Sequence, residues 1–516
     1  MSQFNLVDER WIPLRFPDGT RTELGIRDTL VRSGEITAIE DPSPLVVAAL
    51  HRFLLAILYR ALEGPTDINQ AKALFKRGLQ CEKIIDYLQK WRNWFWLFDE
   101  EHPFYQVPGY EPREQNGRKQ WRSWSAMAAE HNADNAKVLF DHVDVTNAGA
   151  IPSGKAARWL IACQTFAVGG GKSDFQYTKS GPSATAVMVL PIGQNLQDTL
   201  MFSLIPENRA VLPQDKPAWE REPESVVSLQ KGFERPISGL ADLYSWQTRS
   251  IKLHPEAEGK SVSQLVFASG ITSSSKGVID PMLGYRVDEK RGKLPIQIRN
   301  RGLWRDFDSL LPDEAHLAPR VIEHATVLTK HDRRRFPSSI MVLGQANNKA
   351  KIECWRMERF ILPEAIAGER SIRAEIRQNL NDAEEAQRAL WTSCASFTRD
   401  LLSRGNRKAT DKVDKDIRRF IQQMSAIPWF WSTLETHFHE ILNEYTLERN
   451  TDDIRWRWLI MVRETLRKAW QQHSTSVTTG DVWAIRALVK AEGPLRKKLK
   501  ELAEEIRKLE PEKEAL

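Results

Sequence analysis

Thr451-Asp-Asp-Ile-Arg-Trp-Arg-Trp-Leu-Ile-Met-Val-Arg-Glu-Thr-Leu-Arg-Lys-Ala469 is the stretch that decides the fold of the last third of the chain. Its apolar side chains recur three and four positions apart, the spacing of one helix face: Ile454, Trp458, Met461, Val462, Leu466 and Ala469. The polar triplet Thr451-Asp452-Asp453 supplies side chains that accept hydrogen bonds from the first turn. The stretch therefore predicts an amphipathic helix with a defined start.

The same period continues on both sides of this helix. Helical patterns cover residues 369–404, 411–447, 451–474 and 478–510, and Pro428 predicts a break or kink just before Trp429. The last segment carries a short coiled-coil-like seam of Leu495, Leu499, Leu502, Ile506 and Leu509. Four antiparallel helices with short links form a bundle. The sequence thus predicts a C-terminal four-helix bundle over residues 363–516.

The preceding residues, 1–362, mix strand and helix signals. A β-hairpin is predicted at 11–24 around Asp18-Gly19, and helices at about 44–63 and 70–91. Residues 100–135 are rich in Pro, Gly, Gln, Asn and Arg, which predicts long loops. Strand-like runs occupy 184–190, 200–205, 294–298, 340–343 and 352–362. The predicted fold class is α+β, with a large mixed α/β N-terminal domain before the helical bundle.

Composition sets broad limits on function. The chain has 516 residues, 41% hydrophobic residues and 18 Trp, which predicts well-packed globular domains. A net charge of +6 permits nucleic-acid binding without requiring it. Four scattered cysteines argue against a zinc ribbon and favour a reducing cytoplasm. We expect no signal peptide and no membrane span, because the most apolar stretch, 44–62, contains His51, Arg52 and Arg60.

A glycine loop is the first candidate for function. Gly169, Gly170 and Gly171 follow Val168 and precede Lys172 and Ser173. A backbone without side-chain bulk can bring N–H groups against a phosphate or a groove floor. The loop is no nucleotide-binding P-loop, since position 166, where that motif needs glycine, is Phe, and no helical pattern follows. This directs the search to proteins that bind polyanions without hydrolysing ATP.

Two predicted hairpins carry polar tips. Lys290 and Arg291 stand at a turn beside Gly292, where a stiff base would hold a cation forward. The second tip runs from Gln345 to Lys349 and contains Asn347 and Asn348, which tolerate a tight turn. We expect this tip to project from its sheet, where a polar wedge can enter a duplex. Ordinary solvated turns are the alternative for both.

Catalytic patterns are missing. His437 and His439 are two residues apart on a predicted helix and therefore point to different faces. The sequence contains no nucleophile elbow, kinase motif or zinc-protease motif. We therefore expect no catalytic residues, no metal site and no cofactor.

Several segments resemble one family over essentially the whole chain, the CasA family, the large subunit of the type I-E CRISPR Cascade surveillance complex. The resemblance is carried by the segments 4–13, 50–62, 104–107, 135–142 and 431–435. The family usually has Pro where Arg10 stands here.

The resemblance implies a role for each loop. Residues Val168–Ser173 match the glycine loop that meets the minor groove of the protospacer-adjacent motif. Lys290, or its neighbour Arg291, matches a lysine finger. Asn348 and Lys349 match a glutamine wedge that splits the duplex; Lys349 replaces the glutamine, and Gln345 is a nearby substitute. A segment resembling the one that docks near the guide RNA 5′ handle contains Arg113, Arg118, Lys119, Asn132 and Asn135.

The resemblance also implies the partners: target double-stranded DNA, CRISPR guide RNA, other Cascade subunits and a nuclease-helicase, with no membrane. Some relatives carry a clustered-cysteine site that this chain lacks, so zinc is not implied. Basic residues in the bundle, Arg418-Arg419 and Lys497-Lys498-x-Lys500, offer phosphate contacts to DNA. Two alternatives stay open at this point. One is a scaffold that binds only proteins, and the other is a nucleic-acid-processing enzyme that uses Lys172.

Overall fold

The computed structural model describes the chain over residues 4–128, 148–275, 278–299, 301–311, 316–348, 351–361, 370–404, 410–445, 450–477 and 481–510. The chain divides into two compact units. The first comprises Met1–Leu303 and Ser309–Phe360, and the second comprises Trp304–Asp308 and Ile361–Leu516. The predicted boundary after residue 362 lies outside the described residues and stays a prediction.

Helix α2 (Pro44–Ala61) forms the core of the first unit. The Ser43 side chain accepts the Val46 N–H at 3.3 Å, and Pro44 occupies the first turn, where no N–H is needed. Among the described residues α2 is the one helix long and apolar enough to cross a bilayer, yet 94% of it is buried inside the protein. It packs against α5 (Ser153–Phe166) and α8 (Leu240–Tyr244). This is the pattern of a core helix.

The predicted N-terminal hairpin is confirmed. Strands β1 (Ile12–Arg15) and β2 (Arg21–Leu24) pair antiparallel, with β3 (Ala38–Ile39) on the other side of β1. Gly19 supplies the positive φ of 85° that the turn needs.

Two of the predicted elements are wrong. Residues 70–91 form two helices, α3 (Ile68–Arg77) and α4 (Cys81–Trp91), because Gly78 adopts a positive φ of 89° and ends the first. The expected strand at 200–205 is instead part of helix α6 (Leu196–Ser203). Its start is fixed by Asn195, whose side chain accepts the Asp198 N–H at 2.9 Å. A short run that is apolar all round fits a buried helix as well as a strand.

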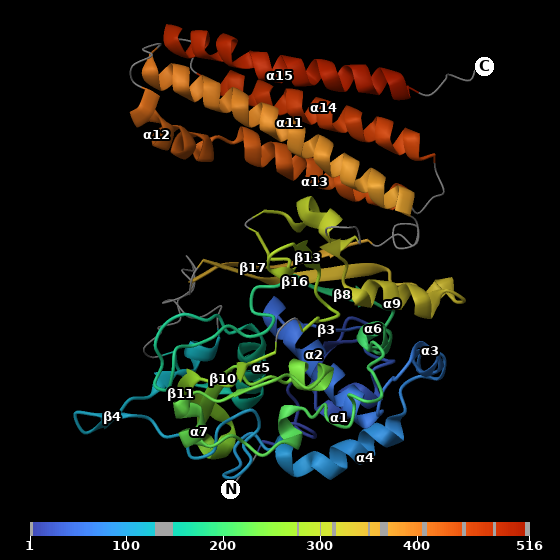
Figure 1. Ribbon diagram of the computed structural model, residues 1–516, viewed down its shortest axis with the longest axis vertical. Helices are drawn as coiled ribbons and strands as arrows, with labels where there is room; N and C mark the ends of the chain where they lie inside the picture. The colour runs from blue at the N-terminus through green and yellow to red at the C-terminus, as the bar shows by residue number, and fades with distance from the viewer. Residues whose placement is uncertain are drawn as a thin grey trace. The chain divides into compact units, whose positions relative to one another are not determined.

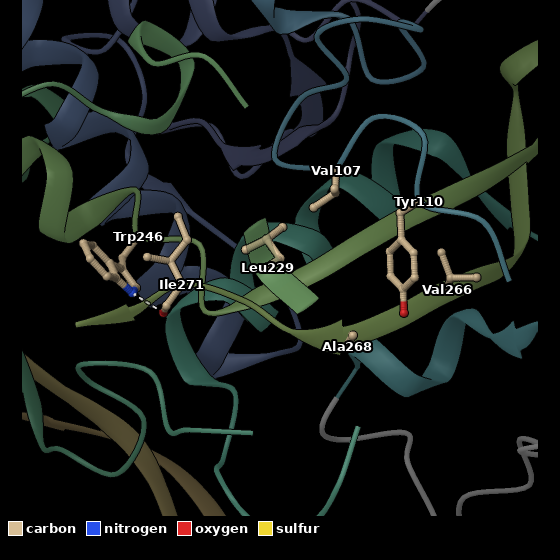
Figure 2. Close-up of a cluster of buried hydrophobic side chains, with 7 residues drawn as sticks. All are labelled: Val107, Tyr110, Leu229, Trp246, Val266, Ala268 and Ile271. Atoms are coloured by element: carbon tan, nitrogen blue, oxygen red, sulfur yellow. Dashed lines mark hydrogen bonds between the residues drawn. The ribbon is translucent and has the colours of Figure 1, made fainter. Parts of the chain in front are cut away.

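A long antiparallel pair, β10 (Arg249–Glu256) with β11 (Ser261–Ser269), supports a cluster of buried side chains drawn in Figure 2. Val266 and Ala268 lie two residues apart on β11 and so share one face. The Trp246 indole N–H donates to the Ile271 carbonyl at 3.1 Å. Phe175, which comes soon after the three glycines, packs against this cluster. The cluster therefore gives the loop an apolar base.

Two further sheets carry the predicted hairpins. One has the order β17-β16-β8, from β17 (Lys351–Phe360), β16 (Ser339–Asn348) and β8 (Met188–Ile192). The other has the order β14-β13-β15, from β14 (Gly292–Pro295), β13 (Tyr285–Asp288) and β15 (His316–Leu317). Single bridges join the two sheets through Met188–Leu283 and Ala186–Gln297.

The remaining elements of the first unit are short. The strands are β4 (Glu114–Gln115), β5 (Arg118–Lys119), β6 (Arg122–Ser123), β7 (Ile151–Pro152), β9 (Glu234–Arg235) and β12 (Thr272–Ser273). The helices are α1 (Ile26–Val31), α7 (Val226–Lys231) and α9 (Arg320–Thr329).

The second unit is a helical bundle, as predicted. Its helices are α11 (Arg370–Ser403), α12 (Thr410–Gln423), α13 (Ala426–Glu444), α14 (Thr451–Ser476) and α15 (Val482–Leu509). Figure 1 shows α11, α13, α14 and α15 side by side, and α12 packs on α11. Trp458 of α14 is fully buried and donates its indole N–H to the Asn379 carbonyl at 2.8 Å.

The break predicted near Pro428 exists but lies earlier in the chain. Helix α12 ends at Gln423 and α13 begins at Ala426, so Pro428 stands in the first turn of α13. A proline is tolerated there because the first N–H groups of a helix have no partner within the helix.

Candidate nucleic-acid interface

The glycine loop, Val168–Ser173, is the first arm of an irregular hairpin that follows α5. The second arm returns to Gly181, and from here on the name glycine loop covers both arms. The Gly170 N–H donates to the Thr178 carbonyl and the Thr178 N–H to the Gly171 carbonyl, both at 3.1 Å. The Gly181 N–H closes the base by donating to the Ala167 carbonyl at 2.8 Å. The loop therefore has two arms joined by main-chain hydrogen bonds.

Glycine is needed at position 169 because the two arms approach closely there. A Cβ on Gly169 would lie 2.6 Å from the Ser180 nitrogen, and the Gly169 N–H already donates to the Ser180 hydroxyl at 2.9 Å. Our expectation that these N–H groups meet a phosphate is wrong for Gly169 and Gly170. Both have acceptors within the hairpin, so neither N–H group is available to a ligand in this conformation.

The far end of the loop is fixed to β11. The Ser173 hydroxyl accepts the Ser269 N–H, and the Ser269 hydroxyl accepts the Gln176 N–H, each at 3.0 Å. Lys172 and Tyr177 pair across the arms and are exposed, Tyr177 by 66%. Tyr177 was not among the site residues predicted from the sequence. An aromatic side chain beside a lysine in such a loop is, however, typical of surfaces that bind single-stranded nucleic acid.

The basic turn between β13 and β14 is confirmed as a hairpin tip. The Asp288 carboxylate accepts the N–H groups of Lys290 at 3.0 Å and Arg291 at 2.9 Å, and Gly292 has a φ of 76°. These N–H groups, Arg291's above all, lower the pKa of Asp288. The turn is thus braced from within, while the Lys290 and Arg291 side chains stay exposed.

The hairpin of β16 and β17 also forms, but Gln345 does not project from it. Gln345 is fully buried, and its Nε2 donates to the carbonyls of Phe166 at 2.6 Å and Ala184 at 2.7 Å. It is therefore excluded as a wedge, because its side chain lies inside the unit. Asn347 is half-buried near the end of β16 and Asn348 is its last residue. Lys349 lies outside the described residues.

Gln345 instead joins the stems of the glycine loop, since Phe166 precedes the loop and Ala184 follows it. This contact was not predictable from the sequence, because the partners are 179 and 161 residues away.

Of the five residues expected near guide RNA, the structure describes three. Arg113 forms an ion pair with Asp174 at 3.5 Å and donates to its carbonyl, which attaches this segment to the glycine loop. Arg118 and Lys119 are exposed on β5, where Lys119 pairs with Glu111 at 3.1 Å. Asn132 and Asn135 lie outside the described residues.

A cavity of about 450 Å³ is bordered by the chain that returns from the glycine loop and by the strands of the basic hairpin. Lys179 and Ser180 line it from the loop, Tyr285 and Lys293 from the hairpin, and Trp246 from the cluster in Figure 2. The segments that carry the glycine loop and the basic turn therefore meet at one cavity, although Val168–Ser173, Lys290 and Arg291 are not among the described residues that line it.

No group of three or more His, Cys, Asp or Glu side chains within the described ranges is placed to hold a metal ion. The four cysteines are free, and burial raises the pKa of the Cys163 thiol to about 12. Cys163 is therefore a neutral thiol at physiological pH.

Comparisons with known proteins point to one family. The family model described as CRISPR-associated protein Cse1 matches residues 5–471. The CRISPR-associated protein CasA/Cse1 of Thermus thermophilus is 29% identical, over 98% of this chain and 99% of that protein.

Solved structures show the same fold. The structure of Thermus thermophilus CasA (Cse1) superposes with a TM-score of 0.83 at 27% identity, covering 97% of this chain and all of that one. A chain of a CRISPR RNA-guided surveillance complex superposes with a TM-score of 0.70 at 16% identity, covering 98% and 100%.

Proposed function

The chain belongs to the CRISPR-associated Cse1 family, and from this premise we propose that it is the large, non-catalytic subunit of a type I-E Cascade surveillance complex. In this proposal it recognises the protospacer-adjacent motif of target double-stranded DNA through the minor groove. It then promotes strand separation, so that guide RNA pairs with the target strand.

One observation carries the proposal: the return arm of the hairpin that begins with the glycine loop and the basic hairpin border the same cavity, which Lys179 and Lys293 both line. Cations at a narrow groove are favoured by the negative potential of the DNA there. The minor groove offers a degenerate pattern of donors and acceptors, so a reader of this groove accepts several related motifs. Guide pairing then supplies the remaining specificity, as in other RNA-guided effectors.

Strand separation is assigned to the end of the β16–β17 hairpin. In this assignment the amide groups of Asn347 and Asn348 compete with base pairing for the edges of the bases. Lys349 is the next residue in the chain. Opening one base step costs on the order of a few kcal/mol, which contacts to the bound motif offset locally. The assignment excludes Gln345, which lies inside the unit.

The other contacts belong to the same proposal. Arg113, Arg118 and Lys119 face guide RNA, and other Cascade subunits and the nuclease-helicase bind elsewhere on the chain. The exposed basic residues of α15, Lys497 and Lys500, hold flanking DNA through its phosphates. The complex acts in the cytoplasm, and the chain needs no cofactor for this work.

A gel-shift comparison tests the proposal. Guide-loaded complex is assembled with and without this chain and titrated with targets that differ only in the flanking motif. We expect the motif preference to vanish without the chain. Equal preference in both assemblies would make the chain a scaffold, and metal-dependent cleavage by the purified chain would make it an enzyme.

A further inference from the structure

Arg249 crosses the base of the glycine loop and contacts both of its arms. It is 3% exposed and begins strand β10. Its Nη2 donates to the Val168 carbonyl at 2.8 Å and its Nη1 to the Lys179 carbonyl at 2.7 Å. Val168 lies in the first arm and Lys179 in the second. A single planar guanidinium therefore fixes the distance between the arms.

This guanidinium has no carboxylate partner among the described residues, which is unusual for a buried arginine. Its acceptors are main-chain carbonyls, and its Nε makes no hydrogen bond. Because burial removes the guanidinium from water, it lowers the pKa of Arg249. A buried charge without a counter-ion destabilises a fold relative to an apolar side chain of similar size. Stability alone therefore gives no reason for an arginine here.

The main chain of Arg249 is itself held in place. The Gln164 side chain of α5 accepts the Arg249 N–H at 2.8 Å and donates to the Arg249 carbonyl at 2.9 Å. The neighbouring Thr248 hydroxyl donates to the Gln164 carbonyl at 2.7 Å. The guanidinium thus stands on a rigid support that reaches back into the core helices.

Arg249 also adds positive charge beneath the loop. It lines a cavity of about 190 Å³ together with Lys172 and Arg122, and no carboxylate is among the described residues that line it. In low-dielectric surroundings such a charge acts over a longer range than an exposed lysine does.

We infer that Arg249 is a positioning residue for the glycine loop, which sets the spacing of the two arms and thereby the preference for the flanking motif. The inference rests on the proposed function, because it needs the loop to read DNA. Arg249 itself does not touch the DNA in this scheme.

The test uses Arg249→Met and Arg249→Lys in fully assembled, guide-loaded complex. Arg60→Met is the matched control, since Arg60 is a partly buried arginine of the same unit that pairs with Glu220 at 2.7 Å, away from the loop. For each complex the affinity ratio between motif-containing and motif-free targets is measured. We expect Arg249→Met to lower this ratio at least tenfold, Arg249→Lys to lower it less, and Arg60→Met to leave it within twofold.

Hydrogen exchange supplies a second readout that does not depend on DNA. Peptides spanning residues 168–180 should exchange faster in Arg249→Lys than in the unsubstituted chain, with peptides of α15 unchanged. An unchanged ratio in Arg249→Met, or unchanged exchange in Arg249→Lys, overturns the inference. If the unsubstituted complex itself shows no motif preference, the proposed function fails instead. The hydrogen-exchange result then still tests whether Arg249 holds the two arms of the loop together.

Discussion

Arg52 and Asp280 form an ion pair inside the first unit, 2.5 Å between Nη1 and Oδ2, with side chains exposed by only 1% and 4%. The same carboxylate accepts the Ser183 hydroxyl at 3.3 Å and the Met282 N–H at 3.0 Å. The Asp280 N–H donates to the Tyr285 hydroxyl at 2.7 Å. One residue thus joins the core helix, the end of the glycine loop and the first strand of the basic hairpin.

We therefore expect Asp280→Asn to be strongly destabilising, because it leaves the Arg52 charge buried without a counter-ion. The expected loss is about 3 to 5 kcal/mol in the free energy of unfolding, measured by chemical denaturation. Glu40→Gln is the control, since Glu40 pairs with the exposed Arg21, and such pairs contribute about 0 to 1 kcal/mol. Similar losses in the two variants would contradict this reading of the core.

Lys290→Ala should weaken binding of motif-containing duplex by the assembled complex. Loss of one cation–phosphate contact lowers the slope of log affinity against log salt by about 1. The measurement is a titration of target duplex at several salt concentrations. Lys83→Ala, which removes an exposed lysine from α4, should leave both affinity and slope unchanged. Identical slopes for the two variants would remove the basic hairpin from the DNA contact.

His51 should make the stability of the chain sensitive to acid. It is buried in α2, its ring nitrogen lies 2.7 Å from the Val47 carbonyl, and burial lowers its pKa from 6.5 to about 4. The unfolded chain therefore binds a proton that the folded chain does not, and stability falls as pH drops from about 6.5 towards 4. The full contribution is about 3 kcal/mol.

His51→Asn tests this linkage, because asparagine does not titrate in that range. The free energy of unfolding of this variant should fall less between pH 6.5 and 4 than that of the unsubstituted chain. Parallel curves for the two proteins would show that His51 contributes nothing to the acid sensitivity.

Gln345→Leu should loosen the base of the glycine loop. The substitution leaves the Phe166 and Ala184 carbonyls without their donor, at a cost of about 1 to 3 kcal/mol. Denaturation gives the free energy, and limited proteolysis within 167–184 reports the local effect. Met357→Ala, on the neighbouring strand and 46% exposed, is the control and should change stability by less than about 0.5 kcal/mol. Equal protection of the loop in all three proteins would exclude the proposed role of Gln345.

Regular spacing and local turn chemistry explain what the sequence predicted well. Asp18-Gly19 specified the first hairpin, and the apolar stripe around Trp458 specified a bundle helix, because both signals lie within a few residues. The run at 200–205 was misassigned because a segment buried on all sides shows no distinguishing period.

The candidate site was predicted only in part, for a different reason. The loop and the basic turn are visible as glycine and lysine runs. Gln345 and Arg249, by contrast, act through side chains that donate to carbonyls many residues away, 81 residues from Arg249 to Val168. Every residue has a main-chain carbonyl, so neither residue type nor spacing indicates which carbonyl a distant side chain will bind. Such contacts can be identified only in the folded structure.

The distance along the chain between Arg52 and Asp280 has a consequence during protein synthesis. The two are 228 residues apart, and a ribosome adds about 5 to 20 residues per second, so Asp280 is added roughly 10 to 50 s after Arg52. Throughout that interval the nascent chain carries an 18-residue apolar helix whose counter-ion has yet to be translated, and its partner helix α8 (Leu240–Tyr244) is made only near the end of it. Newly made protein should therefore depend on chaperones that shield this segment until the ribosome has passed Asp280.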